Sequence, residues 1–363
     1  MLRYMALLVG MFMFLAQAIV PSAMAKTEVK SRKKTELLQV DGRILFRFSQ
    51  SQNEGKTIYG EPNDGFILRK VRFRFHGKLS DNIKYMIHVR ADRGSTVELW
   101  DAFIIYKVKQ IPIPTIIEAG MFKDPISMSY MKPGVKLWFP ERPVAVNKIA
   151  PVWREVGVTL RIKPIKQFEI FASILNGEGW NSGKIYNIDG KYLYVAGVDI
   201  KPINNKFISW RFRGGYEWGH DNSPKEIYLG YGASNGVKRR LIDVETQLAF
   251  NQFGVILEGG YLYDNPKAVD NLVTLGKAKG YYAQADIAFP VYKKFHLVAR
   301  YSWMDPNDKV NDKNDVDYTS VGFYYLINGW QAAIRADYVF AKERDDSAKK
   351  KNDLFCAEFQ LLF

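Results

Sequence analysis

Apolar and polar residues alternate along most of this chain in segments of about ten, the period expected of β-strands that separate two environments. In the first segment one face is apolar and carries Leu38, Val40, Ile44, Phe46 and Phe48. The opposite face is polar and carries Gln39, Asp41, Arg43, Arg47 and Ser49. Only Leu45 departs from the alternation. The pattern therefore predicts a strand with one face in an apolar medium and the other in a polar one.

The same alternation predicts about 16 strands, and an even number is typical of single-chain outer-membrane barrels. The predicted strands cover residues 38–49, 70–79, 83–92, 97–108, 115–123, 154–162, 166–176, 191–201, 207–219, 241–251, 253–264, 279–289, 295–305, 317–327, 331–341 and 354–363. Segment 226–232 is ambiguous, and we interpret it as part of a loop because one more strand would make the total odd.

Connections between the predicted strands alternate between short and long. The short ones are rich in turn residues and lie at 79–82, 163–165, 202–205, 290–293 and 328–329. Long polar connections lie between them at 50–65, 177–190, 264–278 and 342–353. Short periplasmic turns and long external loops are the asymmetry of outer-membrane barrels. The order of the turns places both ends of the barrel domain on the periplasmic side and allows the barrel to close.

Amount and placement of apolar surface separate this fold from a soluble β-sandwich, the alternative all-β architecture. About 16 strands with one apolar face each would supply too much apolar surface for one packed core. The 23 Phe, 21 Tyr and 8 Trp residues, many at strand ends, suit the aromatic girdles of a membrane barrel. We therefore predict an all-β fold, a transmembrane antiparallel β-barrel, that ends on Phe363, a terminal residue typical of an outer-membrane assembly signal.

The first 25 residues have the features of an export signal. Arg3 provides the charged start, residues 5–20 are apolar, and Ala23-Met24-Ala25 is a small-residue cleavage pattern. An uncleaved anchor helix is the alternative, but the apolar run is shorter than the roughly 20 residues that span a bilayer. We expect a signal peptide at 1–25, a flexible, basic periplasmic leader at 26–37 and the barrel at 38–363.

Composition restricts the function classes further. The formal net charge is +14, of which Arg3 in the signal contributes one, so the exported chain is strongly basic. Basic balance in an exported protein favours small anions or anionic lipid as partners over nucleic acid. Cys356 is the single cysteine, which excludes an internal disulfide framework and a cysteine-based metal site.

Several segments resemble the phosphate-selective porin O and P family across essentially the whole exported chain. They are LRKVRF at 68–73, GKL at 77–79, VELWDAF at 97–103, GMFKDP at 120–125, FPER at 139–142, REVGV at 154–158, LNGEG at 175–179 and RYSWMDPND at 300–308. Their order and spacing carry the resemblance more than any one segment does.

The resemblance implies a trimeric porin of about 16 strands with an inward-folded third loop. It also implies a narrow anion site lined by two arginines that open the second strand and by an arginine after the loop's glutamate. Arg69, Lys70 and Arg142 stand at these positions, with Asp101 as the nearby acidic member. Lysine in place of the second arginine keeps the charge but loses the bidentate geometry.

If the apolar faces meet lipid, the opposite faces line the lumen. The second strand then contributes an inward file of Lys70, Arg72, Arg74, His76 and Lys78. Its members are spaced by about 6.8 Å, so the file spans roughly 27 Å. Neighbouring strands add Arg43, Arg47, Lys84, His88 and Arg90. Such a wall would concentrate anions.

Selectivity requires a constriction, because a wide aqueous pore screens its charges. The longest connection, 124–153, is the candidate, and it carries Lys132, Lys136, Arg142 and Lys148. The predicted anion path comprises Arg69, Lys70, Arg72, Arg74, Lys123, Lys136, Arg142 and Arg154. Acidic residues at inward positions, above all Asp101, Glu118 and Glu258, form a predicted counter-wall.

Two functions remain open at this stage besides an anion-preferring channel with phosphate preference. Opposed basic and acidic walls would also suit a general diffusion porin with a transverse field. A non-transport barrel such as an outer-membrane enzyme lacks reagents, because the 4 His residues show no metal-ligand spacing. We expect neither cofactor nor metal; the expected partners are small anions, outer-membrane lipid, the barrel-assembly machinery and two further copies of the chain in a homotrimer.

Overall fold

A computed structural model of the protein describes residues 37–52, 58, 64–92, 96–150, 154–179, 186–222, 236–268, 275–289, 294–309, 315–343 and 352–363. Leu37–Phe363 forms one compact unit. The signal peptide expected at 1–25, the leader up to residue 36 and the loop expected at 226–232 lie outside the described residues. Among the helices that the structure does describe, none combines the length and the apolar character needed to cross a membrane.

One antiparallel sheet contains all the strands that the structure describes. They are β1 (Gln39–Ser51), β2 (Gly65–Lys78), β3 (Ile83–Arg90), β4 (Glu98–Val108), β5 (Thr115–Phe122), β6 (Glu155–Ile165), β7 (Phe168–Leu175), β8 (Leu193–Asn204), β9 (Ile208–Asp221), β10 (Val237–Phe250), β11 (Val255–Asp264), β12 (Lys267–Ala268), β13 (Ala278–Ala288), β14 (Phe295–Asp305), β15 (Val316–Trp330), β16 (Ala332–Glu343) and β17 (Leu354–Leu362).

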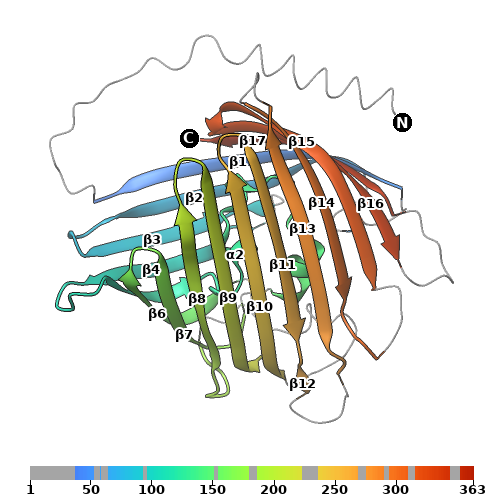
Figure 1. Cartoon of the computed structure of the whole chain (residues 1–363). Coiled ribbons are helices and arrows are strands. Elements are labelled where there is room, and N and C mark those ends of the chain that lie inside the picture. The colour runs from blue at the N-terminus through green and yellow to red at the C-terminus, as the bar shows by residue number, and fades with distance from the viewer. Residues whose placement is uncertain are drawn as a thin grey trace, which may run out of the picture. The chain divides into compact units, whose positions relative to one another are not determined.

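The sheet closes on itself. Apart from the short β12, each strand pairs with its neighbours along the barrel, and β1 pairs with β17 from Arg43 opposite Leu362 to Ser51 opposite Leu354. Figure 1 shows this seam, where the blue first strand meets the red last strand. The backbone of Gly42 donates to the Phe363 carbonyl at 2.6 Å and accepts from its N–H at 3.1 Å. Closure leaves no unpaired sheet edge among the strands that the structure describes.

The short strand β12 is the continuation of β11. Both pair with β10 in the same register, because Leu241 faces Asp264 and Lys238 faces Lys267. Pro266 lies in the gap and has no N–H to donate to the ladder. The barrel therefore has 16 strands, as the sequence predicted. Several strands extend beyond their predicted limits; β2 begins at Gly65 and β10 at Val237.

The two faces of the wall differ as the alternation predicts. On β10 the outward Ile242 and Val244 are exposed, whereas the inward Arg239, Asp243 and Glu245 are buried. This arrangement reverses that of a soluble sandwich, in which the apolar face is the buried one. Burial of the inward charges requires a cover inside the barrel.

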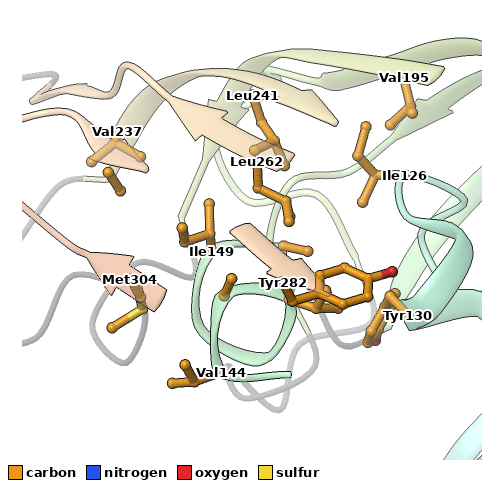
Figure 2. Close-up of a cluster of buried hydrophobic side chains, with 14 of the residues drawn as sticks. Ile126, Tyr130, Val144, Ile149, Val195, Val237, Leu241, Leu262, Tyr282 and Met304 are labelled. Carbon is orange, nitrogen blue, oxygen red and sulfur yellow. The ribbon is translucent and has the colours of Figure 1, made fainter. Parts of the chain in front are cut away.

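The cover is the segment after β5, which holds α2 (Met128–Met131), the 3₁₀ helix η2 (Gly134–Lys136) and α3 (Val144–Ile149). Ile126, Tyr130, Val144 and Ile149 pack against apolar side chains of the strands in one buried cluster, shown in Figure 2. The strand residues labelled there are Val195, Val237, Leu241, Leu262, Tyr282 and Met304.

Two glycines let this segment approach the wall. A Cβ on Gly280 of β13 would lie 2.8 Å from the Cβ of Ala145, and one on Gly215 of β9 would lie 2.9 Å from Ile126 Cδ1. Both distances are shorter than carbon contacts normally allow. The β8–β14 side of the barrel is therefore packed against the segment.

Candidate functional site

A cavity of about 760 Å³ lies on the other side, against β1–β6. Its cationic lining residues are Arg43, Arg69, Lys70, Arg72, Arg74, Arg90, Lys123, Arg142 and Arg154. Its acidic lining residues are Asp41, Asp92, Glu98, Asp101, Glu118 and Glu141. Cations outnumber carboxylates among the described lining residues, so the cavity carries an excess of positive charge.

A β-bulge explains how two adjacent cations of β2 reach this cavity. The register between β1 and β2 shifts so that Leu45 pairs with Lys70 while Phe46 pairs with Leu68. Arg69 is the extra residue, and strict alternation would have directed it toward lipid. Because of the bulge, Arg69 and Lys70 both line the cavity.

A second bulge turns an aromatic side chain into the cavity. His88 pairs with Asp101 and Val89 pairs with Leu99, which makes Trp100 the extra residue. Trp100 is only 4% exposed. The guanidinium carbons of Arg90, Arg154 and Arg72 lie 3.6, 4.3 and 5.2 Å from its ring centroid. Trp100 is thus the centre of a cation–π cluster of three cavity-lining arginines.

Carboxylates neutralise most of the lining arginines. Arg72 pairs with Asp92, and Arg90 donates to Glu98 at 2.8 Å. Further pairs, with their N–O distances, are Arg154–Asp101 at 2.5 Å, Arg69–Glu141 at 3.0 Å and Arg74–Asp41 at 2.7 Å. These pairs orient the arginines, and they reduce the charge that a solute in the cavity would meet.

Four lining cations, Arg43, Lys70, Lys123 and Arg142, form no ion pair with a carboxylate among the described residues. Arg43 Nη2 donates to the Gly134 carbonyl at 3.3 Å. Lys123 Nζ donates to the Tyr130 carbonyl at 2.8 Å, and Arg142 Nη2 donates to the Lys132 carbonyl at 2.6 Å. Lys70 is 8% exposed and forms no side-chain hydrogen bond in the part of the chain that the structure describes. Together with Arg43, the cations Lys70, Lys123 and Arg142 therefore carry the unneutralised charge of the cavity.

Burial changes the acid–base properties of the loop residues. It lowers the pKa of Lys123 well below its usual value, and the charges of Arg142 and Arg154 lower it further. Burial alone would raise the pKa of Glu141, but the charges of Arg47 and Arg69 outweigh it and hold that pKa well below its usual range. Glu141 therefore stays ionised. Its Oε1 lies 2.6 Å from Arg47 Nη2 and 3.0 Å from Arg69 Nη2, so Glu141 bridges the two arginines.

The structure brings most of the predicted path residues together. The predicted members on the cavity are Arg69, Lys70, Arg72, Arg74, Lys123, Arg142 and Arg154. Lys136 is exposed on η2 and is outside the lining. In the predicted counter-wall, Asp101 and Glu118 line the cavity, whereas Glu258 is buried and accepts from Lys132 at 2.6 Å. Glu258 of β11 thus attaches the segment after β5, through Lys132, to the barrel wall.

Trp100 is the site residue that sequence reasoning missed. The sequence carried a signal for it. Glu98 and Asp101 are both acidic and stand three positions apart on one strand, whereas residues on the same face of a regular strand are an even number of positions apart. Both residues line the cavity. The adjacent cations Arg69 and Lys70 are the same signal on β2. An interruption of the period of two in an otherwise regular strand indicates a bulge.

The closed, lipid-facing barrel with a charged cavity inside defines an outer-membrane channel of the porin class. The chain belongs to the phosphate-selective porin O and P family, whose model matches residues 38–363. It is accordingly a porin of the Gram-negative outer membrane.

Solved structures of other proteins share the fold at low sequence identity. The loop L8 deletion mutant of OmpT from Vibrio cholerae aligns with a TM-score of 0.63 at 11% identity, covering 91% of this chain and 100% of that one. The anion-selective porin from Comamonas acidovorans aligns with a TM-score of 0.62 at 10% identity, and the alignment covers 90% of this chain and 99% of that one. OmpF of Salmonella typhi, in complex with daunomycin, aligns with a TM-score of 0.61 at 13% identity, and the alignment covers 92% of this chain and 99% of that one. No curated protein matches the chain by sequence.

Proposed function

We propose that this porin prefers anions and that Lys70, Lys123 and Arg142 set the preference. The observation that carries the proposal is that these cations line the cavity without a carboxylate partner among the described residues. An anion 4 Å from one cation gains about 1 kcal/mol in bulk water and about 4 kcal/mol at an effective dielectric of 20. Partly buried cations therefore attract an anion more strongly than the exposed charges of a wide pore.

Phosphate is the anion we propose to be favoured. The family's name supports it, and so does the placement of Arg69 and Lys70 side by side on the cavity. Arg69 already donates to Glu141 at 3.0 Å, and Arg142 donates to two loop carbonyls. Lys70, with three donors and no side-chain partner among the described residues, would thus make the first contact with a phosphate oxygen.

The segment 123–150 acts as the constriction in this proposal. It is held across the barrel, because Arg335 donates to the Leu137 carbonyl at 2.9 Å and Arg300 to the Glu141 carbonyl at 2.8 Å. Glu245 accepts from the Ser129 N–H at 2.8 Å on another strand. A segment fixed at several points would keep Lys123 and Arg142 at a constant distance from Lys70.

A general diffusion porin is the second candidate. Asp92, Asp101, Glu118 and Glu141 line the same cavity as the cations and favour a transverse field over an anion site. The two candidates differ in the reversal potential across a salt gradient, because only net charge along the path separates anions from cations.

The test is a fourfold charge reversal, Lys70→Glu, Arg72→Glu, Arg74→Glu and Arg142→Glu, recorded in phosphatidylcholine bilayers. We expect the reversal potential to change from anion to cation preference. The control reverses four outward-facing cations, Lys238, Arg240, Lys267 and Lys342, and should leave the reversal potential unchanged. An unchanged potential in the cavity variant would favour the general porin. Loss of phosphate block with retained chloride conductance would show that the path is directed at phosphate.

We further propose a homotrimer that reaches the membrane through the barrel-assembly machinery. One similar structure, OmpT of Vibrio cholerae folded in vitro, is described as a trimer form. For assembly, Phe363 is the proposed signal, and its ring packs edge-on against Phe73 with centroids 6.4 Å apart. Deleting Phe363 should reduce the folded, heat-modifiable form in the outer membrane while synthesis continues. Normal surface levels of the variant would contradict this role.

A further inference from the structure

A group of cations lies on the outer surface of the barrel, apart from the lumen. On β10 the outward positions above the exposed Ile242 and Val244 are Lys238 and Arg240, both exposed. Lys267 of β12 is exposed beside them. These residues stand at the strand ends joined by long connections, which is the extracellular end of a porin barrel. The three cations therefore lie where the outer leaflet ends and its head groups begin.

Two of these cations face each other directly. Lys238 and Lys267 are cross-strand partners in the β10–β12 register. Their Cβ atoms are then about 5 Å apart, and like charges so placed destabilise a sheet. In the part of the chain that the structure describes, none of Lys238, Arg240 and Lys267 has a carboxylate within ion-pair distance. An anion between the side chains would remove the repulsion.

Aromatic side chains mark the level of the membrane at this place. Arg240 pairs across the ladder with Trp218, whose ring stacks with Tyr216 at a centroid distance of 5.3 Å and with Tyr194 at 5.6 Å. Tryptophan and tyrosine concentrate at the boundary between acyl chains and head groups. Arg240 is thus at the head-group level, with the exposed apolar side chains of β10 below it.

The same level of the barrel differs on other strands. The outward residues there include Phe66 on β2 and Leu99 on β4, both exposed and apolar. On β13 Lys279 is paired with Asp305 at 3.3 Å and lies over Trp303. Lys238, Arg240 and Lys267 form a group of a different kind, because their charge is unneutralised among the described residues.

We propose that Lys238, Arg240 and Lys267 bind the phosphorylated head group of the glycolipid that forms the outer leaflet, with its acyl chains against Ile242 and Val244. Alternate residues of a strand lie about 6.8 Å apart and cross-strand partners about 5 Å apart. Three cations at these spacings can surround one phosphate with charge-assisted hydrogen bonds. This inference is independent of the proposed anion selectivity, since the three side chains point away from the lumen.

The experiment measures binding of diphosphoryl lipid A to the purified porin, comparing the intact chain with the variant Lys238→Gln, Arg240→Gln and Lys267→Gln. Each cation near an anionic surface changes the dissociation constant by about 5-fold, so the triple variant should bind about 100-fold more weakly. The matched control neutralises Lys109, Lys166 and Lys206, which are equally exposed but lie at the short turns, and should bind like the intact chain.

Reversal potential and heat-modifiability of both variants should equal those of the intact porin, which separates lipid binding from folding and from the pore. Affinity that is unchanged in the triple variant, or lost equally in the control, would overturn the proposal. Phosphatidylglycerol that binds as tightly as diphosphoryl lipid A would overturn it as well, because attraction to any anionic lipid needs no head-group site. A weaker affinity for monophosphoryl lipid A in the intact chain would support it.

Discussion

The two sides of the barrel interior carry the same kinds of charged residues in opposite situations. On the β8–β14 side the Arg239 side chain is 0% exposed, donates to the Ile149 carbonyl and pairs with Glu217 at 3.0 Å and Asp264 at 3.0 Å. On the β1–β6 side Arg74 pairs with Asp41, and its side chain is 45% exposed. One arginine lies between the wall and the loop, while the other faces the cavity.

This difference shows that burial, more than residue type, decides what a charge does in this lumen. A fully buried ion pair lacks water, so removal of one partner leaves an uncompensated charge. A pair in contact with water contributes little to stability but still acts on a passing ion. The packed side holds the segment 123–150 against the wall, and the open side places charged side chains on the cavity.

The most disruptive test of this comparison is Arg239→Ala. It leaves Glu217, Asp221 and Asp264 without their cation and removes a donor to α3, so we expect a loss of about 3–5 kcal/mol in the free energy of unfolding. Arg74→Ala on the open side should cost about 0–1 kcal/mol. Urea unfolding in lipid vesicles measures both. Equal losses would show that burial does not separate the two sides.

A smaller effect is expected from Trp100→Leu, which removes the aromatic centre of the open side. Three cation–π contacts disappear, which should cost about 1–2 kcal/mol in unfolding free energy. Because Arg90 and Arg154 lose their platform, single-channel conductance and reversal potential should change as well. Trp100→Phe keeps an aromatic face and should restore most of the selectivity. If Trp100→Leu retains wild-type selectivity, the ion pairs alone position the arginines.

The smallest expected effect is a pH dependence from Lys123. Its lowered pKa means that the ammonium loses its proton below the usual lysine value of about 10.4, so anion preference should decline as pH rises through that lowered pKa. Lys123→Met should show a weaker preference than the intact porin at pH values below that lowered pKa and converge with it at pH values above it. Reversal potentials over a pH series measure this. Parallel curves that never converge would assign the decline to another group.

Much of the barrel could be predicted from local sequence pattern. Strand number, the lipid-facing side and the order of short and long connections all follow from the period of two and from turn residues, which depend only on near neighbours in the chain. The inward position of Lys70, Arg72 and Arg74 was predicted in this way, and all three line the cavity. Lys136 was included as a cation of the long connection 124–153 and lies outside the lining.

Only the tertiary structure decided which of the inward charges are paired and which remain unpaired on the cavity. Arg47 pairs with Glu141 at a separation of 94 residues, and Lys132 pairs with Glu258 at a separation of 126. No local pattern encodes such pairings, because they arise when one long loop packs against strands distant in sequence. The amino-acid sequence thus determined the wall and its two faces by short-range periodicity. The path through it was decided by long-range packing, which neutralises some inward charges and leaves Lys70 facing the cavity.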